Sequence, residues 1–189
     1  MARYRVGLET RERILDATRE VLGELGLENA TLKAITERAE VGAGSFYNLF
    51  DSKEEAVLEV LRQAIVAVDP DPAGVGRESL DDLIEAFVRF VTGPDAALAR
   101  IYLQMASQAL SNPAVAARLN RSHRHRVGRF AAAIERESFG VTPADATAHA
   151  ELLLAALMGL AFVLVHDPDF DFPGHAARLP RRPGVAAQA

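Results

Sequence analysis

Apolar residues recur at the spacing of one helix face along most of this chain, and that periodicity limits the fold more than any other feature. In the stretch ETRERILDATREVLGELG, one stripe of a helix would hold Ile14, Leu15, Thr18, Val21, Leu22 and Leu25, all apolar except Thr18. This spacing is typical of a helix with one buried side. We find no strand signal in the sequence, which therefore predicts an all-α protein.

Capping residues, glycines and prolines divide the helical sequence into segments. Thr10 and Thr31 are candidate N-caps, Gly26 is a candidate end of the first helix, and Ser52-Lys53-Glu54-Glu55 has the pattern of a capping box. The predicted helices span approximately residues 10–26, 31–40, 43–49, 52–68, 79–93, 98–109, 113–138 and 142–166.

The proline- and glycine-rich stretch DPDPAGVG separates a group of short helices from a group of longer ones. We predict a three-helix domain over residues 1–51 and a helical effector-binding and dimerisation domain over residues 52–168, with helix 52–68 as the connector. The tail from Asp167 has four prolines and no periodicity, so residues 169–189 are predicted to be loose.

Composition excludes several classes of function. The 189 residues include no cysteine, which removes disulfides, thiolate metal sites and cysteine nucleophiles. The N-terminus has no apolar run of signal-peptide type. The apolar segment Leu152–Val165 is shorter than the roughly 20 residues of a membrane span. We therefore expect a cytoplasmic protein whose last helix is buried on two sides.

The sequence shows no arrangement typical of an enzyme active site. It contains no phosphate-binding loop, no paired catalytic carboxylates and no serine–histidine–aspartate pattern. His123 and His125 are two residues apart, so their side chains diverge on a helix and cannot share a metal ion. We predict no catalytic residues, no cofactor and no metal.

The segment VGAGSFYNLF joins a glycine-containing turn to a short aromatic helix, as in a helix-turn-helix. The second helix of that motif enters the DNA major groove with its N-terminal side chains. Gly42 would permit the turn, and Gly44 would let the backbone approach phosphates. Phe46 and Phe50, four residues apart, should pack inward and leave Tyr47 facing outward.

From about Thr10 to Leu61 the sequence resembles the TetR family of transcriptional regulators. The resemblance rests on TLKAITERAEV after the first helix, on the Gly-Ser-Phe-Tyr core with Phe50, and on Ser52-Lys53-Glu54-Glu55. It implies a ligand-responsive repressor that binds a palindromic operator in double-stranded DNA as a homodimer and is released by a small molecule. The resemblance implies DNA contacts for Thr31, Lys33, Ala43, Gly44, Ser45, Tyr47, Asn48 and Lys53.

Charge gives this DNA-binding hypothesis only local support. Residues 1–60 contain eight Lys or Arg and twelve Asp or Glu, so the segment is not basic overall. We expect Arg3 and Arg5 to lie on a flexible N-terminal arm that could reach DNA. Gly42-Ala43 and Leu49 depart from the family pattern, which leaves Asn48 as the best candidate for hydrogen bonds to bases.

In this family, dimers form four-helix bundles from the last two helices, which here are predicted at residues 113–138 and 142–166. The final helix is apolar almost all round, and small residues such as Ala155 and Gly159 would permit close approach of a partner. The alternative is a central helix in a monomeric bundle.

The resemblance also implies a cavity for a small molecule, apolar or aromatic with one or two polar groups. The candidate lining residues are Phe87, Tyr102, Met105, Gln108, His123, Met158 and Phe162. Each is equally compatible with an ordinary core position. His123 falls on the apolar side of its helix, whereas Arg118, Arg121, His125 and Arg129 form a stripe predicted to be solvated.

A second class of function stays open: a helical dimer that has lost specific DNA binding and acts only through protein contacts. The few polar side chains around Gly42, Ala43 and Leu49 support that alternative. DNA binding with a steep dependence on salt would distinguish the regulator from the interaction protein.

Overall fold

The computed structural model describes residues 2–67, 77–94 and 96–183. Within these residues every regular element is a helix, which confirms the all-α prediction. The helices are α1 (Ala2–Asn29), α2 (Leu32–Arg38), α3 (Ala43–Tyr47), α4 (Lys53–Ala67), α5 (Leu80–Thr92), α6 (Ala96–Gln108), α7 (Pro113–Glu137), α8 (Pro143–His166) and α9 (Phe172–Ala177). The predicted break at DPDPAGVG lies largely outside the described residues.

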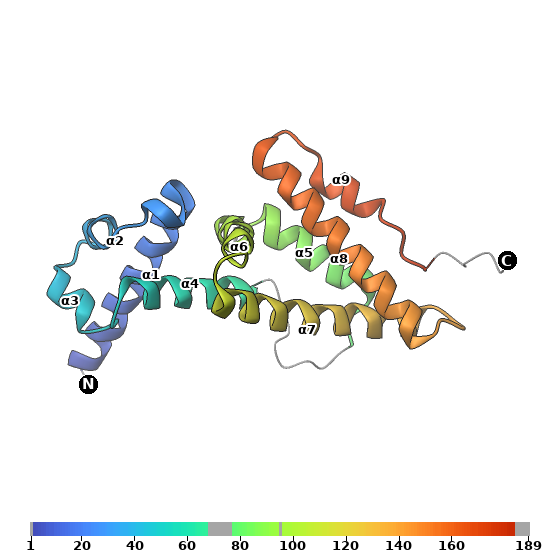
Figure 1. Cartoon of the computed structure of the whole chain (residues 1–189), viewed down its shortest axis with the longest axis horizontal. Coiled ribbons are helices and arrows are strands. Elements are labelled where there is room, and N and C mark those ends of the chain that lie inside the picture. Colours follow the sequence, from blue (N-terminus) through green and yellow to red (C-terminus); the bar gives the residue numbers. More distant parts are fainter. Residues whose placement is uncertain (1, 68–76, 95, 184–189) are drawn as a thin grey trace.

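The helices form two groups joined by α4 (Figure 1). Helices α1, α2 and α3 lie at one end of the molecule, and α4 leads from them to the larger group, α5 to α9. Within the larger group α7 packs along α8, and α9 lies against α8 and α5. Helix α6 also contacts α1 and α4, so it touches both groups.

Side-chain caps start the helices where the sequence predicts. The Thr31 hydroxyl accepts the amide N–H of Ala34 at 3.1 Å at the start of α2. Ser79 and Asp82 form a reciprocal capping box at the start of α5. Thr142 caps α8, which has proline at its first turn. Each cap satisfies an amide that the helix itself leaves free.

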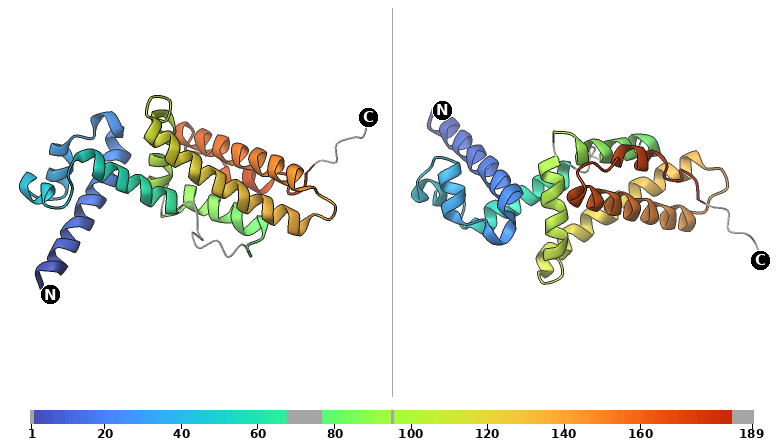
Figure 2. Two further views of the ribbon diagram at one scale, coloured as in Figure 1. Left: turned by 60° about the horizontal axis from the view of Figure 1, so that its bottom comes forward. Right: turned by 90° about the horizontal axis from the view of Figure 1, so that it is seen from above.

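The start of α1 differs from the prediction. Thr10 is not an N-cap, because α1 already begins at Ala2 and the Thr10 hydroxyl donates to the Val6 carbonyl at 2.8 Å inside the helix. Arg5 lies on a helix rather than on a flexible arm, and it pairs with Glu9 one turn later at 3.5 Å. The first turns of α1 project beyond the neighbouring helices (Figure 2).

The C-terminal tail also differs from the prediction, because residues 169–183 are not loose. Phe172 at the start of α9 is buried, with its ring centroid 6.4 Å from that of Phe87. Further along, the Pro180 carbonyl lies 3.0 Å from Nε2 of His149. Two buried apolar side chains, Phe172 and Ala176, together with an Asp171 cap and proline in the first turn, order a segment that shows no periodicity. The remaining residues, 184–189, lie outside the described chain.

Helix α8 is covered on one side within the chain, as expected of its own core, and the second covered side, which we expect a partner subunit to provide, is not tested by a single chain. Leu153, Leu154 and Leu157 are buried, whereas Leu152 is 69% exposed and Phe162 is 62% exposed. The helix is also longer than its apolar segment. By length and composition alone it could cross a membrane, which is weak evidence because core helices of soluble proteins pass the same test.

Candidate DNA interface and effector domain

Helix α3 is held in place by two buried phenylalanines and presents one exposed tyrosine. Phe46 is 0% exposed, Phe50 is 2% exposed, and their ring centroids are 5.5 Å apart. Tyr47 is 56% exposed and meets Phe46 edge-on, with centroids 5.7 Å apart. This confirms the predicted division of the aromatics. A helix too short to be stable alone is thereby fixed by packing.

In the turn before α3, the residue in the left-handed conformation is Glu40 and not a glycine. Glu40 has a φ of 53°, whereas Gly42 has a φ of −75° and caps α3 in an extended conformation. The prediction that Gly42 permits the turn is therefore wrong. The Arg13 guanidinium of α1 donates to the Ala39 carbonyl at 2.6 Å and to the Glu40 carbonyl at 3.0 Å. These bonds hold the left-handed residue in place.

The residues predicted to contact DNA lie on or beside three successive helices. Thr31 caps α2 and Lys33 lies in its first turn; Ala43, Gly44, Ser45 and Tyr47 belong to α3 and Asn48 is its C-cap; Lys53 is the first residue of α4. All are exposed except Lys53, which is half-buried and pairs with Glu54 at 3.7 Å. A Cβ added at Gly44 would meet nothing within 4 Å, so the protein itself does not require glycine there. Open space at this position suits close approach by a ligand backbone.

The capping box at the start of α4 is confirmed with one difference. Ser52 accepts the Glu55 amide N–H at 3.1 Å, as predicted. The Glu55 carboxylate accepts the amide N–H of Asp51 at 2.6 Å, one residue earlier than in the standard pattern. Lys53 is the first residue of α4 and so lies at the positive end of that helix.

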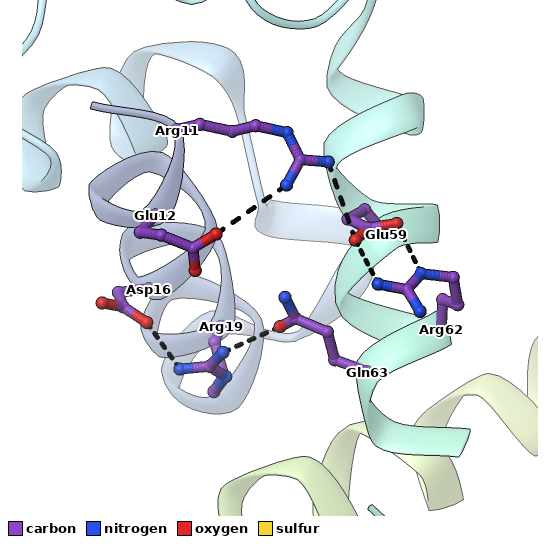
Figure 3. A network of polar contacts seen from close by, with 7 residues as sticks. All are labelled: Arg11, Glu12, Asp16, Arg19, Glu59, Arg62 and Gln63. Carbon is purple, nitrogen blue, oxygen red and sulfur yellow. Dashed lines mark hydrogen bonds and ion pairs between the residues drawn. The ribbon is translucent and has the colours of Figure 1, made fainter. Parts of the chain in front are cut away.

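A polar network fastens α1 to α4 (Figure 3). Its members are Arg11, Glu12, Asp16, Arg19, Glu59, Arg62 and Gln63. Across the two helices, Arg11 lies 3.6 Å from Glu59, and Arg19 donates to Gln63 at 2.8 Å. Hydrogen bonds from Arg62, with its charge and that of Arg11, hold the pKa of Glu59 below its ordinary value, although burial opposes this. Glu59 is thus kept ionised and bound to Arg11.

The predicted effector residues do not form one group. Phe87, Tyr102 and Met105 are buried, and Met158 is half-buried. Phe162 lies on the exposed face of α8, with its ring centroid 5.2 Å from that of His166. Within this chain Phe162 therefore lines no internal cavity. The side chain of Gln108 lies outside the described residues.

Two predictions about α7 are wrong. His123 is exposed rather than on the apolar side. Although much of its surface is open to water, neighbouring groups still displace some water from the ring; this desolvation, followed by the nearby charge of Arg126, holds the pKa of His123 below its ordinary value, against the opposing charge of Glu151. Arg129 is not solvated: its side chain is only 9% exposed and binds the Glu78 carboxylate. This pair fastens α7 to the segment that precedes α5.

Arg126 is the residue that sequence reasoning missed. It is 5% exposed and donates a hydrogen bond to the Tyr102 hydroxyl, with its guanidinium carbon 5.0 Å from the Tyr102 ring centroid. The signal was available in the sequence. Leu119, Arg126 and Phe130 are seven and then four residues apart, which places the arginine on the apolar stripe of α7.

Two apolar-walled cavities adjoin α6 in the described structure. One of about 230 Å³ lies between α1, α4, α6 and the start of α7, and Met105 lines it together with Leu27 and Val57. Another of about 470 Å³ lies between α5, α6 and the end of α8, with Arg100 at its wall. Among the described residues, no group of His, Cys, Asp or Glu could hold a metal ion.

Comparison with known proteins agrees with the geometry of both regions. Residues 14–60 match the model of "bacterial regulatory proteins, tetR family", and residues 76–182 match that of "BetI-type transcriptional repressor, C-terminal". The regulator UidR of Escherichia coli strain K12 is 31% identical over 121 residues, which cover 60% of this chain and 59% of UidR. The repressor KstR of Mycolicibacterium smegmatis is 36% identical over 61 residues, 32% of this chain and 30% of KstR.

A solved structure shows the same fold. The transcriptional regulator from Saccharomonospora viridis in complex with choline superposes with a TM-score of 0.71 at 20% identity, covering 90% of this chain and 93% of that one. The proteins compared are transcriptional regulators and not enzymes. With the family's DNA-binding region and a repressor C-terminal region both matched, the chain belongs to the TetR family of bacterial transcriptional regulators.

Proposed function

We propose that this chain is a ligand-responsive repressor that binds a palindromic operator as a homodimer in the cytoplasm and is released by a small molecule. The observation that carries the proposal is the construction of α3. Phe46 anchors the helix in the core while its exposed side offers Ser45, Tyr47 and Asn48. A rigid helix with short polar and aromatic side chains suits insertion into a major groove.

An exposed apolar stripe on α8 supports the dimer. Leu152, Ala155, Gly159 and Phe162 are all exposed and are separated by three, four and three residues. That spacing puts them on one face of the helix. A continuous apolar face with small residues at its centre is typical of an interface that a second copy covers in a symmetric contact. We propose that this face of α8 pairs with its copy, with α7 beside it.

The effector is proposed to bind within α5 to α8. The regulator from S. viridis was solved with choline, which supports small-molecule binding by proteins of this fold. Tyr102 and Met105, on the buried face of α6, remain the best candidates from the sequence. Because α6 contacts both α1 and α4, a ligand that displaces α6 would change how α1 and α4 are held. Release follows if the ligand binds better to the conformation with misplaced α3 helices.

Removing one exposed positive charge at the proposed DNA interface should weaken binding without changing which sequence is preferred. Lys33 is exposed near the start of α2, and its ammonium group lies 3.8 Å from Glu37. We expect Lys33→Gln to lower the slope of log affinity against log salt by about one unit, because one phosphate contact is lost. The measurement is fluorescence anisotropy of operator DNA over a salt series.

Arg89→Gln on α5 is the matched control, since Arg89 is exposed in the other helix group. It should leave both the affinity and the salt slope unchanged. If the wild-type protein binds no DNA sequence more tightly than it binds random-sequence DNA, at any salt concentration, the regulator proposal is wrong. The alternative of a dimeric interaction protein would then be preferred.

A further inference from the structure

Arg126 is a buried charge whose hydrogen-bonding groups are only partly used. Its side chain is enclosed between α6 and α7, and one terminal nitrogen donates to the Tyr102 hydroxyl. Nε and the other terminal nitrogen are buried and have no hydrogen-bond partner. Buried polar groups are normally satisfied, and a buried charge is normally paired with an opposite one. The unused donors therefore need an explanation.

No acidic side chain of the described structure neutralises this guanidinium. Arg126 instead contacts the neutral phenol of Tyr102, through a hydrogen bond and through the face of the ring. By contrast, Arg129, one turn away on α7, forms an ion pair with the Glu78 carboxylate. Arg126 thus provides an uncompensated positive charge inside the effector domain.

We propose that Arg126, with Tyr102, binds an oxyanion group of the effector, most simply a carboxylate. The inference rests on the proposed regulatory function and names the chemical class of its ligand. A guanidinium carries five N–H donors in a fixed plane and can give two of them to one carboxylate. The Tyr102 hydroxyl, which accepts from Arg126, can donate its own hydrogen to the same group.

The surroundings of Arg126 indicate that the rest of the effector is apolar. On α7, Leu119 and Phe130 share its buried face, and on α6 Leu98 and Met105 lie one turn on either side of Tyr102. The family resemblance implies an apolar or aromatic ligand with one or two polar groups. Arg126 assigns a negative charge to one of those groups. It also disfavours a cation such as choline, because like charges in a poorly solvated site repel strongly.

The closed position of Arg126 links anion binding to a conformational change. The side chain is covered by its own chain, so an incoming anion must separate α6 from α7 locally. Helix α6 contacts α1 and α4 as well as α7. An anion that binds only the separated arrangement would therefore shift the population toward a different placement of the DNA-binding helices.

The test compares acids with neutral molecules of the same shape. Benzoate, 2-naphthoate and octanoate, their three primary amides, and choline are titrated into the wild-type chain by isothermal calorimetry. For at least one of the three acids, the affinity should exceed that of its own amide by about tenfold or more, as expected for a charge-assisted hydrogen bond. Choline should show no binding. If no acid binds more tightly than its amide, the proposal is overturned without any variant being needed.

Two variants test whether the preference for an acid over its amide arises at Arg126. In Arg126→Met, which replaces the buried charge with an unbranched apolar side chain, the preference for the acid should disappear. Arg121→Met, on an exposed position of the same helix, should keep it. Survival of the preference in Arg126→Met overturns the proposal. Operator binding is measured separately: wild-type protein that binds no DNA refutes the regulatory function, whereas DNA binding without an acid preference refutes only the Arg126 site.

Discussion

Replacing Phe46 with alanine should lower the free energy of unfolding of the chain by about 3–5 kcal/mol, the usual cost of emptying a phenylalanine site in a core. The Phe46 side chain has no exposed surface and packs against Phe50 and Tyr47. Helix α3 has few other contacts that could replace it, because only Phe46 is buried within its five residues. Urea denaturation followed by circular dichroism measures the change.

Tyr47→Ala is the matched control, because it removes the adjacent aromatic ring of the same helix. Tyr47 is more than half exposed, so its loss should cost about 0.5 kcal/mol or less. If the two substitutions lowered the stability by similar amounts, this would contradict the assignment of Phe46 as the buried anchor and Tyr47 as the exposed aromatic residue. A Phe46→Ala variant as stable as the wild type would contradict the burial itself.

Placing a charge on the exposed stripe of α8 should separate the proposed dimer. Phe162→Glu puts a carboxylate within a face that, in the proposed dimer, excludes water, and a buried unpaired charge is strongly disfavoured. We expect monomers in analytical ultracentrifugation and a fall in operator affinity on the order of a hundredfold, since the two DNA-binding units no longer bind together.

Leu110→Glu controls for the effect of introducing an acid at an exposed apolar position. Leu110 is 92% exposed in the turn between α6 and α7 and is not part of the α8 stripe. This variant should stay dimeric and bind the operator with wild-type affinity. A dimer that persists in Phe162→Glu would show that another surface pairs the subunits.

The sequence predicted best those features that depend on neighbouring residues. The caps at Thr31 and Thr142 involve residues three apart, and the inward positions of Phe46 and Phe50 follow from a spacing of four. Such features depend on local geometry and on the difference between apolar and polar side chains. They can therefore be predicted from one sequence without knowledge of the tertiary structure.

The features that were missed depend on contacts between distant parts of the chain. Phe172 of α9 packs beside Phe87 of α5, and the carbonyl of the left-handed Glu40 accepts a hydrogen bond from Arg13 of α1. The burial of Arg126 depends on the approach of α6 to α7. In each case, a local pattern gave the chemistry of the residue but not its partner, which only the tertiary structure supplies.

The central claim is that the chain recognises DNA through α3 as a dimer. The most direct measurement is selection from random double-stranded DNA by the wild-type protein, followed by titration of the enriched sequence with wild-type protein and Tyr47→Ala. The account predicts an enriched palindrome, two chains bound to each site, and at least a tenfold weaker interaction for Tyr47→Ala, because base and phosphate contacts of α3 are lost. Selection that enriches no common sequence, or binding that is unchanged in Tyr47→Ala, would contradict it.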